Sequence, residues 1–277
     1  MGAFFEEIPE SQIKWILEQK LFYVATAPLS AKGHINVSPK GGPYFGVDNP
    51  RTFWYQELTG SGSETMSHLY ENGRITIMLT AFTGPPRILR LWGHGTVLEH
   101  GTPAFSAFVA SHPSITTIPG TRSIIKVDIH QVGTSCGFSV PYFDFVGHRD
   151  ILNEHFRKKD ARFRAGKEGE SMPRYWAYKN AWSMDGLPAM KTGLEAAREH
   201  GVKPIRKMVG RAGEELAYAS NKYGGGRKVA SLEQLLLVAL VCLLMGALAA
   251  VQGPALVGRL QAVAREAPRP SLMAWSG

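Results

Sequence analysis

Cysteine is nearly absent from this chain of 277 residues. The two cysteines, Cys136 and Cys242, are too few and too far apart for a disulfide-stapled scaffold or a zinc ribbon. We therefore expect the protein to reside in a reducing compartment. Its nine histidines show no spacing typical of a metal site. The sequence thus predicts no metal centre.

The signatures of several functional classes are missing as well. Lysine and arginine outnumber acidic residues 31 to 23, which gives a net charge of +8, but the basic residues form only short clusters such as 157–159. The sequence has neither a basic stripe nor a recognisable nucleic-acid-binding module, so we expect no nucleic-acid partner. Scattered, solvated side chains account for the excess of positive charge. The sequence contains no Gly-x-Ser-x-Gly nucleophile elbow, so it gives no support for a hydrolase that uses one.

Short strand-like runs dominate the first half of the chain. Runs rich in β-branched and aromatic residues predict six strands, at residues 21–27, 34–38, 53–58, 74–79, 87–98 and 123–129, with Pro39 ending the second. Helices are expected at residues 9–20, 64–72 and 102–111. Because no helix separates the first three strands, a small and mostly antiparallel barrel is favoured over a doubly wound parallel sheet.

Beyond this barrel the sequence changes character. Residues 136–230 are irregular, aromatic and charged, and they contain helical patches at 150–159 and 192–200. We expect an appended lid or extension with some helix. The expected fold class is therefore mostly β with appended helices.

A long apolar block occupies residues 235–258, where no residue is charged and Gln252 is the one strongly polar side chain. Such a run is a candidate transmembrane helix, and its ten leucines and valines up to Val251 contribute about −3 to −6 kcal/mol to insertion. A buried core helix is the alternative, and Gly253 with Pro254 would shorten a span. Basic residues at 222, 227 and 228 favour a single-pass membrane protein with its N-terminal domain in the cytosol, although arginines also follow the block.

Two short segments carry residues suited to binding a ligand. In the first, Asn36, Ser38 and Lys40 alternate along a strand that ends in two glycines, which let a flat ligand approach, while the lysine offers a point charge. A strand end with a solvated lysine is the alternative.

The second segment is the small-residue turn at residues 59–65, which runs into a helix. It contains Ser61, Gly62, Ser63, Glu64 and Thr65. Unpaired N–H groups and the positive end of the helix dipole there suit a phosphate, although plain N-capping by Ser63 is an equally simple explanation. The Gly-Lys-Ser/Thr of a P-loop is absent.

In order and spacing, these segments resemble the pyridoxamine-phosphate-oxidase-like family of FMN-binding split barrels. The resemblance covers residues 8–135 and is carried by residues 34–41, 60–65, 71–77 and 87–93. It implies FMN at a homodimer interface beside a small-molecule substrate. Asn36, Ser38 and Lys40 would line the flavin, and residues 61–65 would hold its phosphate.

Two departures from the family pattern stand out. The oxidases proper have Ser-Arg-Lys where this chain has Ser63-Glu64-Thr65, so a phosphate would need a cation from elsewhere, with Arg87 and Arg90 as candidates. The C-terminal Arg-x-His substrate motif is not found either. The resemblance is thus to a relative with its own extension, and we expect pyridoxamine phosphate to be a poor substrate.

The sequence therefore predicts an FMN-dependent oxidoreductase-like flavoprotein, tethered to a membrane, whose substrate and catalytic residues are unknown. Lys40 is the residue expected to tune the flavin ring. The alternative is a non-catalytic flavin- or haem-binding split barrel that serves in sensing or scaffolding.

Overall fold

The computed structural model describes residues 2–209 and Cys242. The chain forms two units, Met1–Ala217 and Tyr218–Gly277, and the description below concerns the first. The apolar block at 235–258 and the last part of the predicted extension lie outside the described residues, apart from Cys242. Among the described residues, no helix combines the length and the apolar character that a membrane crossing requires.

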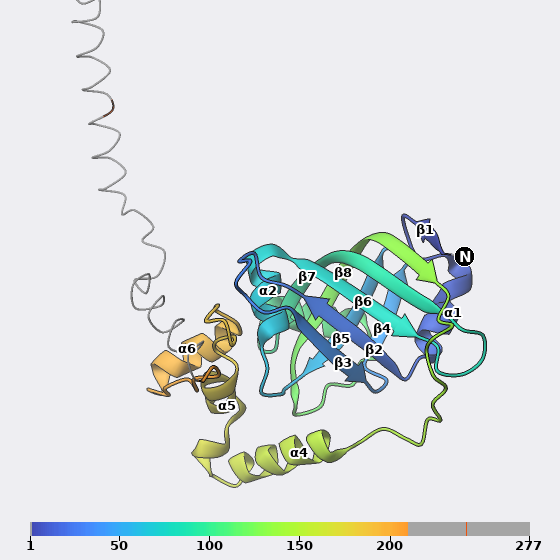
Figure 1. The fold of residues 1–277 in the computed structure, drawn as a ribbon. Helices are drawn as coiled ribbons and strands as arrows, with labels where there is room; N and C mark the ends of the chain where they lie inside the picture. Colours follow the sequence, from blue (N-terminus) through green and yellow to red (C-terminus); the bar gives the residue numbers. More distant parts are fainter. Residues whose placement is uncertain (1, 210–241, 243–277) are drawn as a thin grey trace, which may run out of the picture. The chain divides into compact units, whose positions relative to one another are not determined.

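Eight strands form one antiparallel sheet (Figure 1). Their order is β3-β2-β6-β7-β8-β5-β4, and β1 pairs with β8 outside this path. The strands are β1 Ala3–Phe5, β2 Leu21–Thr26, β3 Asn36–Gly41, β4 Phe45–Asn49, β5 Thr52–Leu58, β6 Arg74–Thr80, β7 Ile88–Glu99 and β8 Thr121–Ser135.

The sheet curls on itself, because strands that are far apart in this order touch. Lys40 on the edge strand β3 lies 2.8 Å from the carboxylate of Glu57 on β5. On β2, the ring of Phe22 meets the rings of Phe45 and Phe53 edge-on. The enclosed side chains form the core, in which Val24, Ile77, Leu91 and Ile125 are among the fully buried residues. This curled antiparallel sheet fits a split barrel, as the sequence predicts.

A glycine at a strand bulge allows two strands to pack closely. The register of β7 against β8 shifts between Trp92 and Gly93. A Cβ atom on Gly93 would lie 2.3 Å from the carbonyl oxygen of Asp128, far inside van der Waals contact. Bulges of this kind bend strands and increase their twist, which helps a sheet to curl.

In the described part of the chain six helices accompany the sheet, and α1, α2 and α3 pack against its strands. They are α1 Glu10–Glu18, α2 Glu64–Asn72, α3 Pro103–Ser111, α4 Ile151–Arg164, α5 Met172–Lys179 and α6 Lys191–Glu199, with a 3-10 turn η1 at Glu168–Glu170. Helix α2 ends at Gly73, whose φ of +74° and N–H bond to the carbonyl of Leu69 make a left-handed C-cap.

Several elements differ from the sequence-based expectation. The prediction that Pro39 ends its strand is wrong, since β3 continues to Gly41. Because β3 is an edge strand, a proline can lie in it with its nitrogen facing away from β2. Strand β8 begins at Thr121, close to the predicted 123, but runs to Ser135, well beyond the predicted 129. The sequence pattern does not predict the strands β1 and β4 or the helix α5.

The described part of the extension, residues 136–209, belongs to the same compact unit as the barrel. Trp176 and Met190 are buried in the barrel core. The buried carboxylate of Glu99 at the end of β7 accepts hydrogen bonds from the backbone N–H groups of Lys191 and Thr192, at 2.7 and 2.9 Å. These N–H groups belong to the first turn of α6, so Glu99 caps that helix and fixes it to the barrel.

Candidate functional site

A cavity of about 1470 Å³ opens beside the edge strand of the barrel. Most residues of β3 and the ends of β2 and β5 line it, together with the turn at residues 59–65 and the segment 143–153 of the extension. The cavity therefore combines the two segments that the sequence singles out.

Strand alternation directs the predicted strand residues into this cavity. Asn36, Ser38 and Lys40 all line it, whereas the side chain of Val37 between them faces outward and is 62 % exposed. The Asn36 amide donates to the hydroxyl of Thr65 at 3.0 Å and its oxygen accepts from Ser38 at 3.1 Å. These bonds tie β3 to the first turn of α2.

The turn at residues 59–65 contributes Gly60, Gly62, Glu64 and Thr65 to the cavity lining, but not Ser61 or Ser63. The Ser63 hydroxyl makes no capping bond and instead donates to the carbonyl of Trp182 at 2.9 Å. The N–H groups in the first turn of a helix have no acceptor within the helix. Those of Glu64 and Thr65 therefore lack an acceptor within α2, and they lie at the positive end of its dipole.

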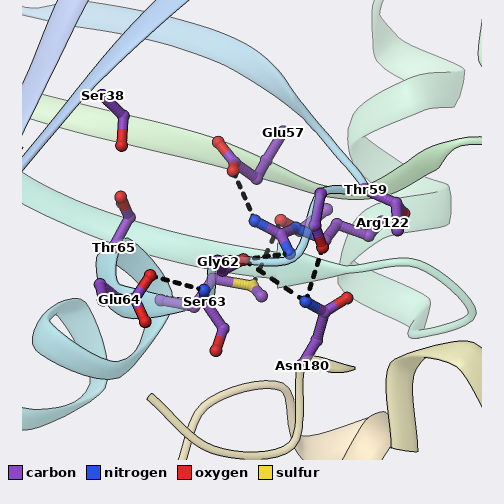
Figure 2. Close-up of polar contacts among 12 residues, drawn as sticks. Ser38, Glu57, Thr59, Gly62, Ser63, Glu64, Thr65, Arg122 and Asn180 are labelled. Carbon is purple, nitrogen blue, oxygen red and sulfur yellow. Dashed lines mark hydrogen bonds and ion pairs between the residues drawn. The ribbon is translucent and has the colours of Figure 1, made fainter. Parts of the chain in front are cut away.

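The extension fixes the shape of this turn (Figure 2). Trp176 donates to the hydroxyl of Thr59 at 3.0 Å, and the Asn180 amide donates to the carbonyl of Gly60 at 2.9 Å. The carboxylate of Glu64 accepts from the N–H groups of Ser63 and Met184, at 2.9 and 3.1 Å.

The ammonium group of Lys207 lies 3.6 Å from the Glu64 carboxylate. Burial lowers the pKa of Lys207, although the neighbouring Glu64 acts in the opposite direction. Glu64, the anion that departs from the family pattern, is thus held by the extension and has a cation beside it.

Three charged side chains meet at the inner end of the cavity, and we refer to Lys40, Glu57 and Arg122 as the Glu57 cluster. One carboxylate oxygen of Glu57, Oε1, lies 2.8 Å from Lys40 Nζ and 2.7 Å from Arg122 Nη2. Glu57 and Arg122 are 1 % and 3 % exposed. Burial by itself raises the pKa of Glu57, but Lys40 and Arg122 together hold that pKa below its ordinary value. The carboxylate is therefore ionised at neutral pH.

Sequence reasoning missed two residues of this cluster, Glu57 and Arg122. In the β5–β8 pairing Glu57 faces Ser123 while Leu58 faces Thr121, so Arg122 is the extra residue of a bulge. A bulge turns a side chain away from the regular alternation, and Arg122 also donates to the carbonyl of Gly62 at 2.7 Å. Nothing in the local sequence signals this inward direction.

Arg87 and Arg90, the cations expected near the turn, are not brought to the cavity. Arg87 donates to the side chain of Gln12 at 2.9 Å and lies over the ring of Trp15. Arg90 contacts the hydroxyl of Ser135 at 3.4 Å. The arginine that contacts the turn is instead Arg122.

Fold and site together define a split-barrel protein with a ligand-sized cavity between its edge strand and a helix N-terminus. Over 202 residues the chain is 38 % identical to the pyridoxamine 5'-phosphate oxidase family protein ustO of Aspergillus flavus, and the match covers 70 % of this chain and 80 % of that protein. The chain belongs to the pyridoxamine 5'-phosphate oxidase family. No family model matches it.

Solved structures also show similarity to part of the chain. HupZ of Group A Streptococcus is 20 % identical, with 45 % of this chain and 92 % of that chain covered and a TM-score of 0.36. The FAD binding protein of Mycobacterium smegmatis is 14 % identical, with 47 % and 97 % covered and a TM-score of 0.33. At these TM-scores the likeness decides nothing about this chain.

Replacing Arg122 by methionine tests the cluster. The variant Arg122→Met leaves the buried Glu57 carboxylate with one cation, and we expect the free energy of unfolding to fall by about 3–5 kcal/mol. Arg51→Met is the matched control, since Arg51 pairs with Glu7 at 3.0 Å but is half exposed, and its loss should cost less than about 1 kcal/mol. Urea denaturation measures both, and equal losses would contradict a structural role for the cluster.

Proposed function

We propose that this protein binds FMN in the cavity and acts as a flavin-dependent oxidoreductase on a small-molecule substrate. The observation that carries the proposal is the meeting of β3 with the N-terminus of α2 around one cavity, in a chain of this family. The strand supplies polar side chains for a flat ring, and the helix supplies N–H groups for a phosphate.

The residues present fit such a ligand. Asn36, Ser38 and Lys40 offer donors and acceptors along one face, and Lys40 places a cation where the charge of a flavin ring is tuned. The N–H groups of Glu64 and Thr65 suit a single phosphate, which favours FMN over FAD. Bound flavin supplies the electron transfer, while the chain binds and orients it.

The size of the cavity leaves room for a substrate. Ligand pockets usually measure about 300–1,000 Å³, and the volume here is about 1470 Å³. Phe143 and Phe145 line the side formed by the extension. These aromatic side chains suit an apolar or aromatic part of a second small molecule.

Flavin content is the direct test. We expect the purified full-length protein to be yellow and to release FMN, not FAD, on denaturation, as identified by absorbance and chromatography. Lys40→Met should weaken flavin binding or shift its reduction potential, because it removes a cation from the cavity. The control Lys126→Met removes an exposed lysine of β8 and should change neither. A protein that remains free of flavin after FMN is added, or shows a haem Soret band, contradicts the proposal.

We also propose that the protein is a homodimer. Ile35 and Val37 are 75 % and 62 % exposed on the outward side of the edge-strand region, where apolar side chains gain from burial against a second copy.

Light scattering in mild detergent should give twice the chain mass of 30.4 kDa. Val37→Glu should shift the protein towards monomer, whereas Leu29→Glu, which alters an exposed residue outside the strands, should not. A wild-type monomer at every concentration would refute the dimer.

The membrane tether is a further part of the proposal, and it is supported by the uncharged residues 235–258. The full-length protein should stay with membranes during carbonate extraction, because a spanning helix is not released by high pH. A chain that stops before Leu235 should be released into the supernatant. Equal release of both chains would mean that the apolar block is a core or dimer helix instead.

A further inference from the structure

The N-terminal end of α2 carries a negative charge that opposes an anionic ligand. Glu64 is the first residue of α2 and lines the cavity, so its carboxylate belongs to the same turn as the N–H groups proposed to hold a phosphate. Its side chain is 15 % exposed, and buried charges are screened less than charges in water. A phosphate at this turn therefore requires that the charge of Glu64 be compensated.

The carboxylate of Glu64 is folded back onto the turn. Its Oε2 accepts from the N–H group of Ser63 at 2.9 Å, and its Oε1 accepts from the N–H group of Met184 at 3.1 Å. A Cβ atom on Gly62 would lie 2.7 Å from Oε2, so the glycine leaves the space that this conformation needs. Because both oxygens are bonded to backbone groups, the negative charge is fixed at the turn.

A lysine of the extension lies against this carboxylate. Lys207 Nζ donates to the hydroxyl of Ser63 at 2.8 Å and lies 3.6 Å from Glu64 Oε1. The side chain of Lys207 is also 15 % exposed, so this ion pair is less screened than one at the surface. Lys207 is not among the residues that line the cavity, and it contacts the turn from outside that lining.

A buried arginine also contacts the turn. Arg122 lines the cavity, is 3 % exposed and donates to the carbonyl of Gly62 at 2.7 Å. Its Nε has no hydrogen-bond partner among the described residues, and an oxygen-rich ligand group is suited to supply the missing acceptor. With two cations and one carboxylate, the Glu57 cluster keeps one net positive charge. Glu64 would cancel that charge if Lys207 did not offset Glu64.

We propose that Lys207 is the counter-charge that allows this turn to accept a phosphate group. It acts through Glu64 and not by direct contact with the ligand. The inference rests on the proposed flavin site, and it adds to that site a residue of the extension. The phosphate of FMN then contributes to affinity because Lys207 is in place.

The test separates the phosphate from the rest of the flavin. Fluorescence quenching gives the dissociation constants of FMN and riboflavin for the full-length protein, and their ratio measures the preference for the phosphate. We expect Lys207→Met to reduce this preference by about fivefold or more, because the charge of Glu64 is then uncompensated. Lys203→Met, which removes an exposed lysine of the same segment, should keep the wild-type preference. A purely structural role of Lys207 would weaken both ligands equally, and that result overturns the inference.

Glu64→Gln shows whether Lys207 acts through Glu64. This variant keeps the length of the side chain and removes its charge, so its preference for FMN should equal or exceed that of wild type. In the double variant with Lys207→Met, the preference should return to within about twofold of wild type, because the two charges are coupled. A double variant whose preference is as low as that of Lys207→Met contradicts the coupling and overturns the inference.

Inorganic phosphate provides a readout that needs no flavin. At equal ionic strength, phosphate should raise the thermal midpoint of wild type above its value in chloride, because a ligand that binds the folded state stabilises it. The rise should be smaller in Lys207→Met than in Lys203→Met, a comparison that cancels the general stabilising effect of phosphate salts. An equal rise in the two variants overturns the inference.

The two proposals fail separately. If no variant binds any flavin, the proposed function fails and the phosphate comparison still decides the role of Lys207. If Lys207→Met does not fold, Glu64→Gln decides, since a preference for FMN below that of wild type is incompatible with a compensated anion at the turn.

Discussion

The ion pair between Glu57 and its two cations is the interaction on which the architecture of the cavity depends. Lys40 comes from the edge of the sheet, and Glu57 and Arg122 come from two paired strands on its other side. Buried charges are tolerated only when they are paired, so the cluster holds these strands at one separation. The position of β3, and with it the open side of the cavity, follows from that contact.

The second constraint comes from outside the barrel. Trp176, Asn180 and Met184 bond to the turn that precedes α2, and Glu99 caps α6 in return. The part of the cavity lining formed by this turn is therefore shaped by a segment that follows the barrel in sequence. The barrel and the described part of the extension form one compact unit, although the family motifs in the sequence lie in the barrel alone.

The parts of the site that the sequence could predict are those that depend on residues close together in the sequence. Alternation along β3 and the turn into α2 are local, so Asn36, Ser38, Lys40 and Thr65 can be singled out from the sequence, and the structure brings them to one cavity. Glu57 gives no signal, because every residue from Thr52 to Glu57 is buried and alternation is lost. Arg122 depends on a bulge between strands distant in sequence, and the short β1 and β4 have too little periodicity to be detected.

Pro39 has a consequence for how copies of this protein can meet. Its ring nitrogen carries no hydrogen, and a proline within a sheet is confined to an edge strand with its nitrogen on the open side, so the missing donor belongs to the open edge of β3. A second strand that paired with the open edge of β3 would lack one backbone hydrogen bond at this residue. Association through this region must therefore use side-chain packing of residues such as Ile35 and Val37, and a continuous intermolecular sheet is disfavoured.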